Sequence, residues 1–190
     1  MHSSTRRGLI LALCLSLPAA AIAQSDTAVI ERRNQVREMA RDALSSLFEI
    51  NPSARTVIEH AAGFGVFSTF GVKFLFAGGT TGKGLVVSNR THRETFMRMV
   101  GAQAGLGFGA KSDRLVFVFE TQAALRNFVD QGWEFGAQAN VAAALADQGA
   151  MMSGALAVSP GVYVYQITSS GLAAQLTVSG TKYFRDDEMY

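Results

Sequence analysis

The stretch GAQAGLGFGAKSDRLVFVFET, residues Gly101 to Thr121, decides the fold of this protein. Its first half is a predicted strand that carries glycine at positions 101, 105, 107 and 109. A turn is predicted at Lys111–Arg114, and Leu115–Phe119 has the strongest strand pattern in the chain. Glycines leave one side of the first strand almost without side chains, so we expect another element to pack closely against that side.

The same composition extends towards the N-terminus of this stretch. Eleven of the nineteen glycines lie between Gly63 and Gly109, and five of the thirteen phenylalanines lie between Phe64 and Phe76. Aromatic residues favour strands, and glycines permit strands to twist and approach one another. We therefore predict a glycine-rich sheet here, with turns at Gly78–Gly82 and Ser88–Thr91.

Helical patterns flank this region. Apolar residues recur at the 3.6-residue period from Thr27 to Glu49, with acidic residues on the opposite side, so we expect this helix to pack on the protein rather than lie on an anionic bilayer. Ser53–His60 is a predicted second helix. Thr121 is the predicted N-cap of a third helix, which ends at Gly132.

The C-terminal third is mostly strand in pattern. Trp133–Ala144 fits either a strand or a helix, whereas Val162–Ile167 and Leu172–Val178 fit a hairpin, and the chain ends in a charged run, Arg185–Glu188. Together these elements predict an α+β fold. It is a single domain in which N-terminal helices pack on a glycine-rich, mainly antiparallel curled sheet with one internal helix.

The N-terminus has the pattern of an export signal. Two arginines precede an apolar run, and Ala21-Ile22-Ala23 is a small-x-small cleavage site, so we predict a signal peptide over residues 1–23 and a periplasmic, secreted chain that begins at Gln24. The single cysteine, Cys14, follows Leu13, whereas a lipid-attachment site needs a small residue there. We interpret Cys14 as part of the signal.

Without residues 1–23 the chain has no cysteine, so its core must be stable without disulfides. The remaining 167 residues are enough for one such core. We divide them into an N-terminal helix, residues 24–50, and a main region, residues 51–190, that together form one globular unit.

Charge is unevenly distributed along the predicted mature chain, which has fifteen basic and fifteen acidic residues. Residues 61–114 hold seven basic and two acidic residues, so an anionic partner is expected to contact this segment. Six of the basic residues are candidates for a binding patch, and Arg98 belongs to the same segment. The six are Lys73, Lys83, Arg90, Arg93, Lys111 and Arg114. The alternative is that they only mark solvated turns and strand ends.

Motifs for catalysis and cofactor binding are not found. The segment Ala77–Gly84 has glycines and a lysine, but it lacks the first glycine and the Ser or Thr of a phosphate loop. The glycines before Lys111 lead into a strand rather than the helix that a dinucleotide fingerprint needs. The mature chain has two histidines, and no local spacing indicates a metal site. No serine lies in a nucleophile-elbow sequence. We therefore predict a protein that is not an enzyme, with no cofactor and no nucleic-acid partner.

Three long blocks resemble a known family. They are GKGLVVSNRTHRETFMRMVGAQAGLGFGAKSDRLVFVFETQAALRNFV, GWEFGAQANVAAA and PGVYVYQITSSGLAAQLTVSGTKYFRDD. They look like the SYLF domain family of lipid-binding proteins, also described as actin-binding through its yeast members, and the resemblance runs from about Arg41 to Tyr190. Residues 51–190 are then the SYLF-like domain. Eukaryotic members bind phosphoinositides, phosphatidylinositol lipids that carry phosphates. The basic amphipathic leading helix of some of them is replaced here by a helix with an acidic outer side.

The resemblance implies a lipid-binding, membrane-associated module of the cell envelope, with an anionic lipid or membrane surface as its partner. It assigns no individual binding residue, so the six basic residues are candidates on the charge distribution alone. The alternative is a structural envelope protein that acts by self-association, as a homo-oligomer, or by contact with a partner protein. A lipid that copurifies with the protein would favour the first function, and a lipid-free oligomer would favour the second.

Overall fold

The computed structural model describes residues 19–134, 151–152, 154–172 and 180–190; at positions 19–25, 76, 103–108 and 151–152 it describes the backbone only. The elements are α1 (Ala19–Ile50), α2 (Ser53–His60), β1 (Gly63–Ser88), β2 (Glu94–Phe119), α3 (Gln122–Asp130), β3 (Trp133–Glu134), β4 (Met151–Met152), β5 (Ala155–Ser159), β6 (Val162–Thr168), β7 (Gly171–Leu172), β8 (Thr181–Arg185) and a final 3₁₀ turn, η1 (Asp187–Met189). Every described strand pairing is antiparallel, and the predicted α+β fold is confirmed.

The sheet is built around one long hairpin. β1 and β2 each have 26 residues, join through the Ser88–Arg93 turn and pair along nearly their whole length. The other edge of β2 is shared, because β8 pairs with Met97–Gly101 and β6 pairs with Arg114–Phe119. Between those two pairings, β1 is the only strand of the described residues that pairs with β2, and the backbone N–H of Ala102 also donates to the carbonyl oxygen of Gly180 at 3.2 Å.

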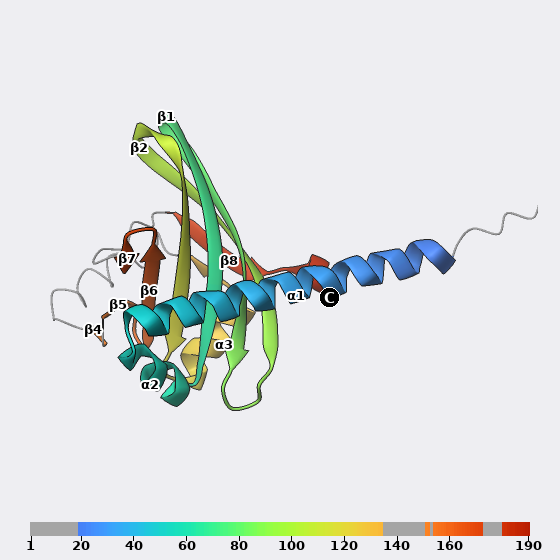
Figure 1. Cartoon of the computed structure of the whole chain (residues 1–190), viewed down its shortest axis with the longest axis horizontal. Coiled ribbons are helices and arrows are strands. Elements are labelled where there is room, and N and C mark those ends of the chain that lie inside the picture. The colour runs from blue at the N-terminus through green and yellow to red at the C-terminus, as the bar shows by residue number, and fades with distance from the viewer. Residues whose placement is uncertain (1–18, 135–150, 153, 173–179) are drawn as a thin grey trace, which may run out of the picture.

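This two-stranded ribbon bends sharply in the middle of each strand. The register shifts between Leu75 and Ala77, and Leu75 has a φ of 56°. Each strand therefore runs away from the helices, bends and returns, so that the bend lies at the top of Figure 1 and the Ser88–Arg93 turn at the bottom. The predicted turn at Gly78–Gly82 is wrong, because these residues continue β1 just beyond the bend.

Glycines allow the two halves of β1 to approach each other. A Cβ placed on Gly82 would lie 2.6 Å from the carbonyl oxygen of Ser68, and one on Gly84 would overlap the carbonyl oxygen of Val66. Both contacts are far closer than van der Waals contact allows, so only glycine fits at positions 82 and 84. The predicted close approach concerned Gly101, Gly105, Gly107 and Gly109 of β2. It is met at Gly101, where an added Cβ would lie 2.9 Å from the Thr181 hydroxyl of β8, but not at Gly109, which has no atom within 4 Å of that position; the side-chain surroundings of positions 105 and 107 lie outside the described residues.

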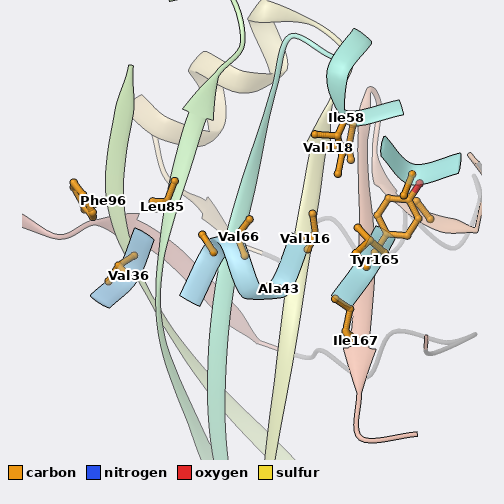
Figure 2. Close-up of a cluster of buried hydrophobic side chains, with 14 of the residues drawn as sticks. Val36, Ala43, Ile58, Val66, Leu85, Phe96, Val116, Val118, Tyr165 and Ile167 are labelled. Atoms are coloured by element: carbon orange, nitrogen blue, oxygen red, sulfur yellow. The ribbon is translucent and has the colours of Figure 1, made fainter. Parts of the chain in front are cut away.

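One core lies between the helices and one face of the sheet (Figure 2). The predicted apolar stripe of α1 supplies Val36, Ala40, Ala43 and Leu47, all buried. They pack on Val66 and other buried residues of the sheet. The rest of the labelled cluster is Ile58 of α2, Leu85 of β1, Phe96, Val116 and Val118 of β2, and Tyr165 and Ile167 of β6. Packing of α1 on the protein is thus confirmed.

A second core covers the other face of the sheet. α3 begins at the predicted cap, where the Thr121 hydroxyl accepts a hydrogen bond from the backbone N–H of Ala124 at 3.1 Å. Its Phe128 packs among Phe67, Phe117 and Tyr183, whose rings lie within 6.2 Å of it. Burial raises the pKa of the Tyr183 phenol, so this ring stays neutral at ordinary pH.

The sequence prediction also placed a turn at Lys111–Arg114, and this is wrong. These residues continue β2 and pair with Ser68–Gly71. Asp113 makes the polar sequence compatible with a strand, because its Oδ2 accepts a hydrogen bond from Gln166 Nε2 at 2.9 Å and lies 2.8 Å from Lys111 Nζ. Gln166 is far away in the sequence, so the local pattern does not reveal this partner.

The charged C-terminal run is docked on β2 rather than free. Arg98 Nε lies 3.3 Å from the buried carboxylate of Asp186, and its terminal nitrogens reach Glu188. The backbone N–H of Phe96 donates to the hydroxyl of Tyr190 at 2.9 Å. Because η1 also contacts α1, the C-terminus ties the helix to the sheet.

Candidate functional site

The strongest candidate site is the bent part of the long hairpin, which we call the ribbon end: Phe70–Thr81 of β1 and Val100–Ser112 of β2. It concentrates exposed apolar side chains. Phe74 is 70% exposed, Phe70 51%, Val72 53%, Val100 47% and Leu75 43%. Only three other large apolar side chains of the described residues are exposed to this degree, namely Ile30, Ile50 and Tyr190.

The local strand geometry explains why these side chains gather. Phe70, Val72 and Phe74 are two residues apart, so they point to one face of the ribbon. Val66 points to that same face, but there α1 covers it. In Figure 1 the ribbon rises beyond α1. The apolar face therefore continues past the helix that buries its lower part.

Two of the predicted basic residues lie at the ribbon end. Lys73 pairs with Gly109 and Lys111 pairs with Gly71, so the two lysines are diagonal neighbours on the opposite face from Phe74. Lys73 is half-buried and Lys111 is exposed, with its ammonium beside Asp113. These cations are within about 10 Å of the apolar tip along the strands.

Lys83 and Arg114 lie further from the tip. Arg114 pairs with Ser68 and Lys83 pairs with Arg98, so each is about six residues, or roughly 20 Å, from the bend. Lys83 lines a small hollow beside Arg32 and Met39 of α1. Arg98 holds the C-terminal run. The structure thus separates these residues from the lysines of the ribbon end.

Arg90 and Arg93 come together in the Ser88–Arg93 turn, which joins β1 to β2 far from the bend. Both are exposed in the Ser88–Arg93 turn and line a cavity of about 330 Å³ together with Arg126 of α3. Arg126 was not among the predicted residues, because it lies outside the basic segment and meets the turn only through the fold. The six candidates therefore do not form one continuous patch.

The bend itself carries backbone strain. Leu75 adopts a left-handed conformation, which costs a residue with a side chain about 1–2 kcal/mol relative to the usual regions. Glycine would avoid this cost, and the chain is rich in glycine nearby. A large, exposed apolar side chain is instead present at this position, which is the kind of exception that marks functional segments.

The phenylalanine-rich Phe64–Phe76 segment is divided between core and surface. Phe67 is fully buried, and Phe64 packs against the core between the helices and the sheet. Phe70 and Phe74 are exposed. The alternation from Phe70 to Phe74 signals one common face, but only the position of α1 decides whether that face is covered.

No helix in the described part of the chain is both long enough and apolar enough to span a membrane. The same residues contain no cluster of three or more His, Cys, Asp or Glu side chains arranged to hold a metal ion.

Comparisons with known proteins agree with the resemblance in the sequence. A family model described as "Las17-binding protein actin regulator" matches residues 100–189. "Beta cell expansion factor A" of Aeromonas veronii is 35% identical over 162 residues, which cover 84% of this chain and 59% of that protein. The chain therefore spans about three fifths of the length of this curated relative.

Proposed function

This chain belongs to the SYLF family, a family of lipid- and actin-binding-related domains, and from that premise we propose that it is an exported, non-catalytic module that binds anionic membranes of the cell envelope. The observation that carries the proposal is the exposed apolar face of the ribbon end, with Lys73 and Lys111 close behind it. Export is supported by the signal pattern of residues 1–23.

The apolar side chains provide the larger part of the expected binding free energy. A phenylalanine side chain buries about 150–250 Å² when it is fully enclosed. Given the exposed fractions of Phe70 and Phe74, their transfer into the bilayer interface removes roughly 180–300 Å² from water. At about 25 cal/mol per Å², this contributes about 4.5–7.5 kcal/mol at full insertion.

Electrostatic attraction contributes less binding free energy than the apolar side chains, but it favours anionic over neutral membranes. Each lysine near an anionic surface contributes about 1 kcal/mol, and salt screens this contribution. Lys73 and Lys111 together therefore add about 2 kcal/mol, and the ion pair with Asp113 reduces the share of Lys111. We expect binding that favours anionic over neutral vesicles and weakens, but persists, at high salt.

Vesicle co-sedimentation tests the proposal with three matched variants of the mature chain, on phosphatidylglycerol–phosphatidylethanolamine and on phosphatidylcholine vesicles. Phe70→Ser with Phe74→Ser is expected to abolish binding. Lys73→Gln with Lys111→Gln is expected to weaken it by up to about thirtyfold at low salt and less at high salt. Ile50→Ser removes another exposed apolar side chain, at the end of α1, and is expected to leave binding unchanged.

The double serine variant decides between membrane insertion and self-association. If it binds vesicles as the wild type does, insertion of the ribbon end is wrong. If the wild type instead forms a concentration-dependent dimer in analytical ultracentrifugation, ignores vesicles, and loses the dimer in the same variant, the apolar face pairs with a second copy. That result would favour the alternative of a self-associating envelope protein.

A further inference from the structure

A second site lies at the Ser88–Arg93 turn, which is far from the bend that forms the ribbon end. The Ser88–Arg93 turn and α3 line a cavity of about 330 Å³ that is open to solvent. Figure 1 shows this turn at the bottom of the view, on the same side as α3. Small-molecule sites usually have volumes of about 300–1,000 Å³, so the cavity suits a small ligand.

The cavity has a strong positive charge for its size. Arg90, Arg93 and Arg126 line it, against one carboxylate, Asp130, which gives a net charge of +2. Within the residues that the structure describes, none of the three arginines forms an ion pair. Their guanidinium groups therefore remain available to an anion that enters from solvent.

Hydrogen bonds fix the backbone on both sides of the cavity. The Asn89 side-chain amide donates to the carbonyl oxygens of Ile58 and Ala61 at 2.6 and 3.0 Å, which anchors the turn to the end of α2. The Thr121 cap fixes the start of α3. The arginines therefore project from a fixed frame, and such preorganisation lowers the cost of binding.

The lining combines cations with hydroxyl groups and apolar side chains. Ser88 and Thr91 supply hydroxyl groups, and Val86, Leu125 and Val129 supply an apolar surface. A phosphate monoester carries a charge of about −1.5 to −2 near neutral pH, which matches the net charge of +2 of the cavity lining. A single arginine can donate two parallel hydrogen bonds to two oxygens of one phosphate group. We propose that this cavity binds the phosphate monoester group of a small ligand, whose organic part contacts the apolar side chains.

The position of the cavity separates this site from the proposed membrane contact. From the bend to the turn, β1 runs for about eleven residues, or roughly 35 Å. A bilayer that receives the ribbon end therefore does not reach the cavity. The phosphate group must come either from a water-soluble molecule or from a lipid on a different surface, and the inference does not depend on insertion of the ribbon end.

Isothermal titration calorimetry with glycerol 3-phosphate tests the water-soluble source. We expect saturable binding to the wild type, weakened at least about tenfold by Arg93→Gln and by Arg126→Gln, because each removes a charged hydrogen-bond donor. All three arginines are exposed, so these variants are expected to fold. Arg41→Gln makes the same change on an exposed part of α1 and is expected to bind like the wild type.

Vesicles test the lipid source. Phosphatidic acid carries a phosphate monoester and phosphatidylglycerol a diester, so they are compared on the Phe70→Ser, Phe74→Ser variant, which lacks the ribbon-end contact. Binding to phosphatidic acid alone that Arg93→Gln abolishes assigns the site to a lipid phosphate monoester. If neither glycerol 3-phosphate nor phosphatidic acid binds, or if both arginine variants bind as the wild type does, the inference is wrong, whatever the ribbon end does.

Discussion

The sharpest test of the folded ribbon is a pair of alanine substitutions in one strand. At Gly84 an added Cβ would overlap the carbonyl oxygen of Val66 and lie 2.5 Å from the Phe67 ring. At Gly79 the nearest atom, the carbonyl oxygen of Gly101, is 3.9 Å away. Both glycines lie in β1, so the two substitutions differ mainly in the space available to the new methyl group.

The two substitutions are expected to change the free energy of unfolding in opposite directions. Overpacking at Gly84 costs about 1–3 kcal/mol, because Val66 and Phe67 belong to the two buried cores and have no room to move. Gly79→Ala gains about 0.5 kcal/mol from the lower backbone entropy of the unfolded chain. The two variants should therefore differ by about 1.5–3.5 kcal/mol in the free energy of unfolding. For a chain of this length 1 kcal/mol shifts Tm by about 2–4 °C, so Gly84→Ala should melt about 3–14 °C below Gly79→Ala.

Differential scanning calorimetry of the mature chain measures this difference. Equal melting temperatures for the two variants would show that the halves of β1 are not in contact at Gly84, and the folded ribbon would then be wrong. Gly180 is no suitable control, although its place near the terminus predicts a mild effect. Its φ of 62° strains any residue with a side chain.

Three further predictions follow from single contacts. Arg98→Gln leaves the buried carboxylate of Asp186 without its ion-pair partner, so urea unfolding should show a loss of about 1–3 kcal/mol, and no loss would mean that the C-terminal run does not stabilise the fold. Leu75→Gly relieves the strain of the left-handed backbone conformation but removes an exposed apolar side chain. We therefore expect an unchanged or higher Tm together with weaker vesicle binding. A lower Tm would contradict the strain argument. Intact mass spectrometry of the exported protein should give the mass of a chain that begins at Gln24. A diacylglyceryl group on Cys14 would overturn both the predicted cleavage and the cysteine-free mature chain.

The elements that the sequence predicted correctly are those set by neighbours in the chain. The periodicity of α1, the cap at Thr121 and the turn after Ser88 depend on residues within a few positions, and all three are confirmed. The Ser88–Arg93 turn is closed by hydrogen bonds between Ser88 and both Arg93 and His92. Local chemistry is sufficient for such elements.

The bend was not predictable in the same way. Polar residues at Lys111–Arg114 and glycines at Gly78–Gly82 have the composition of turns. In the structure the first segment is kept in a strand by Gln166, and the glycines of the second segment allow contact with residues such as Ser68 and Val72. Both causes lie in distant parts of the chain, where composition gives no sign of them.

The candidate site was predicted only in part for a similar reason. A net excess of positive charge between residues 61 and 114 is visible in the sequence, but the fold separates these cations: two lie near the bend, two lie in the Ser88–Arg93 turn, and Lys83, Arg98 and Arg114 lie between these places. Lys73 and Lys111 meet across the ribbon, whereas Arg90 and Arg93 meet Arg126 of α3. Sequence position therefore gave the sign of the charge, and the pairing of β1 with β2 gave its location.

Stability does not explain the composition of the ribbon end. Both buried cores lie in the part of the sheet that α1 and α3 cover, and the two-stranded ribbon beyond them would be marginal by itself. Polar residues at Phe70, Phe74 and Leu75 would remove exposed apolar surface, and glycine at Leu75 would remove backbone strain. The chain thus has exposed apolar residues and a leucine in a left-handed conformation outside the two buried cores. Such an arrangement is expected where the exposed surface itself performs the function, and insertion into a membrane is a function that requires this surface to stay apolar.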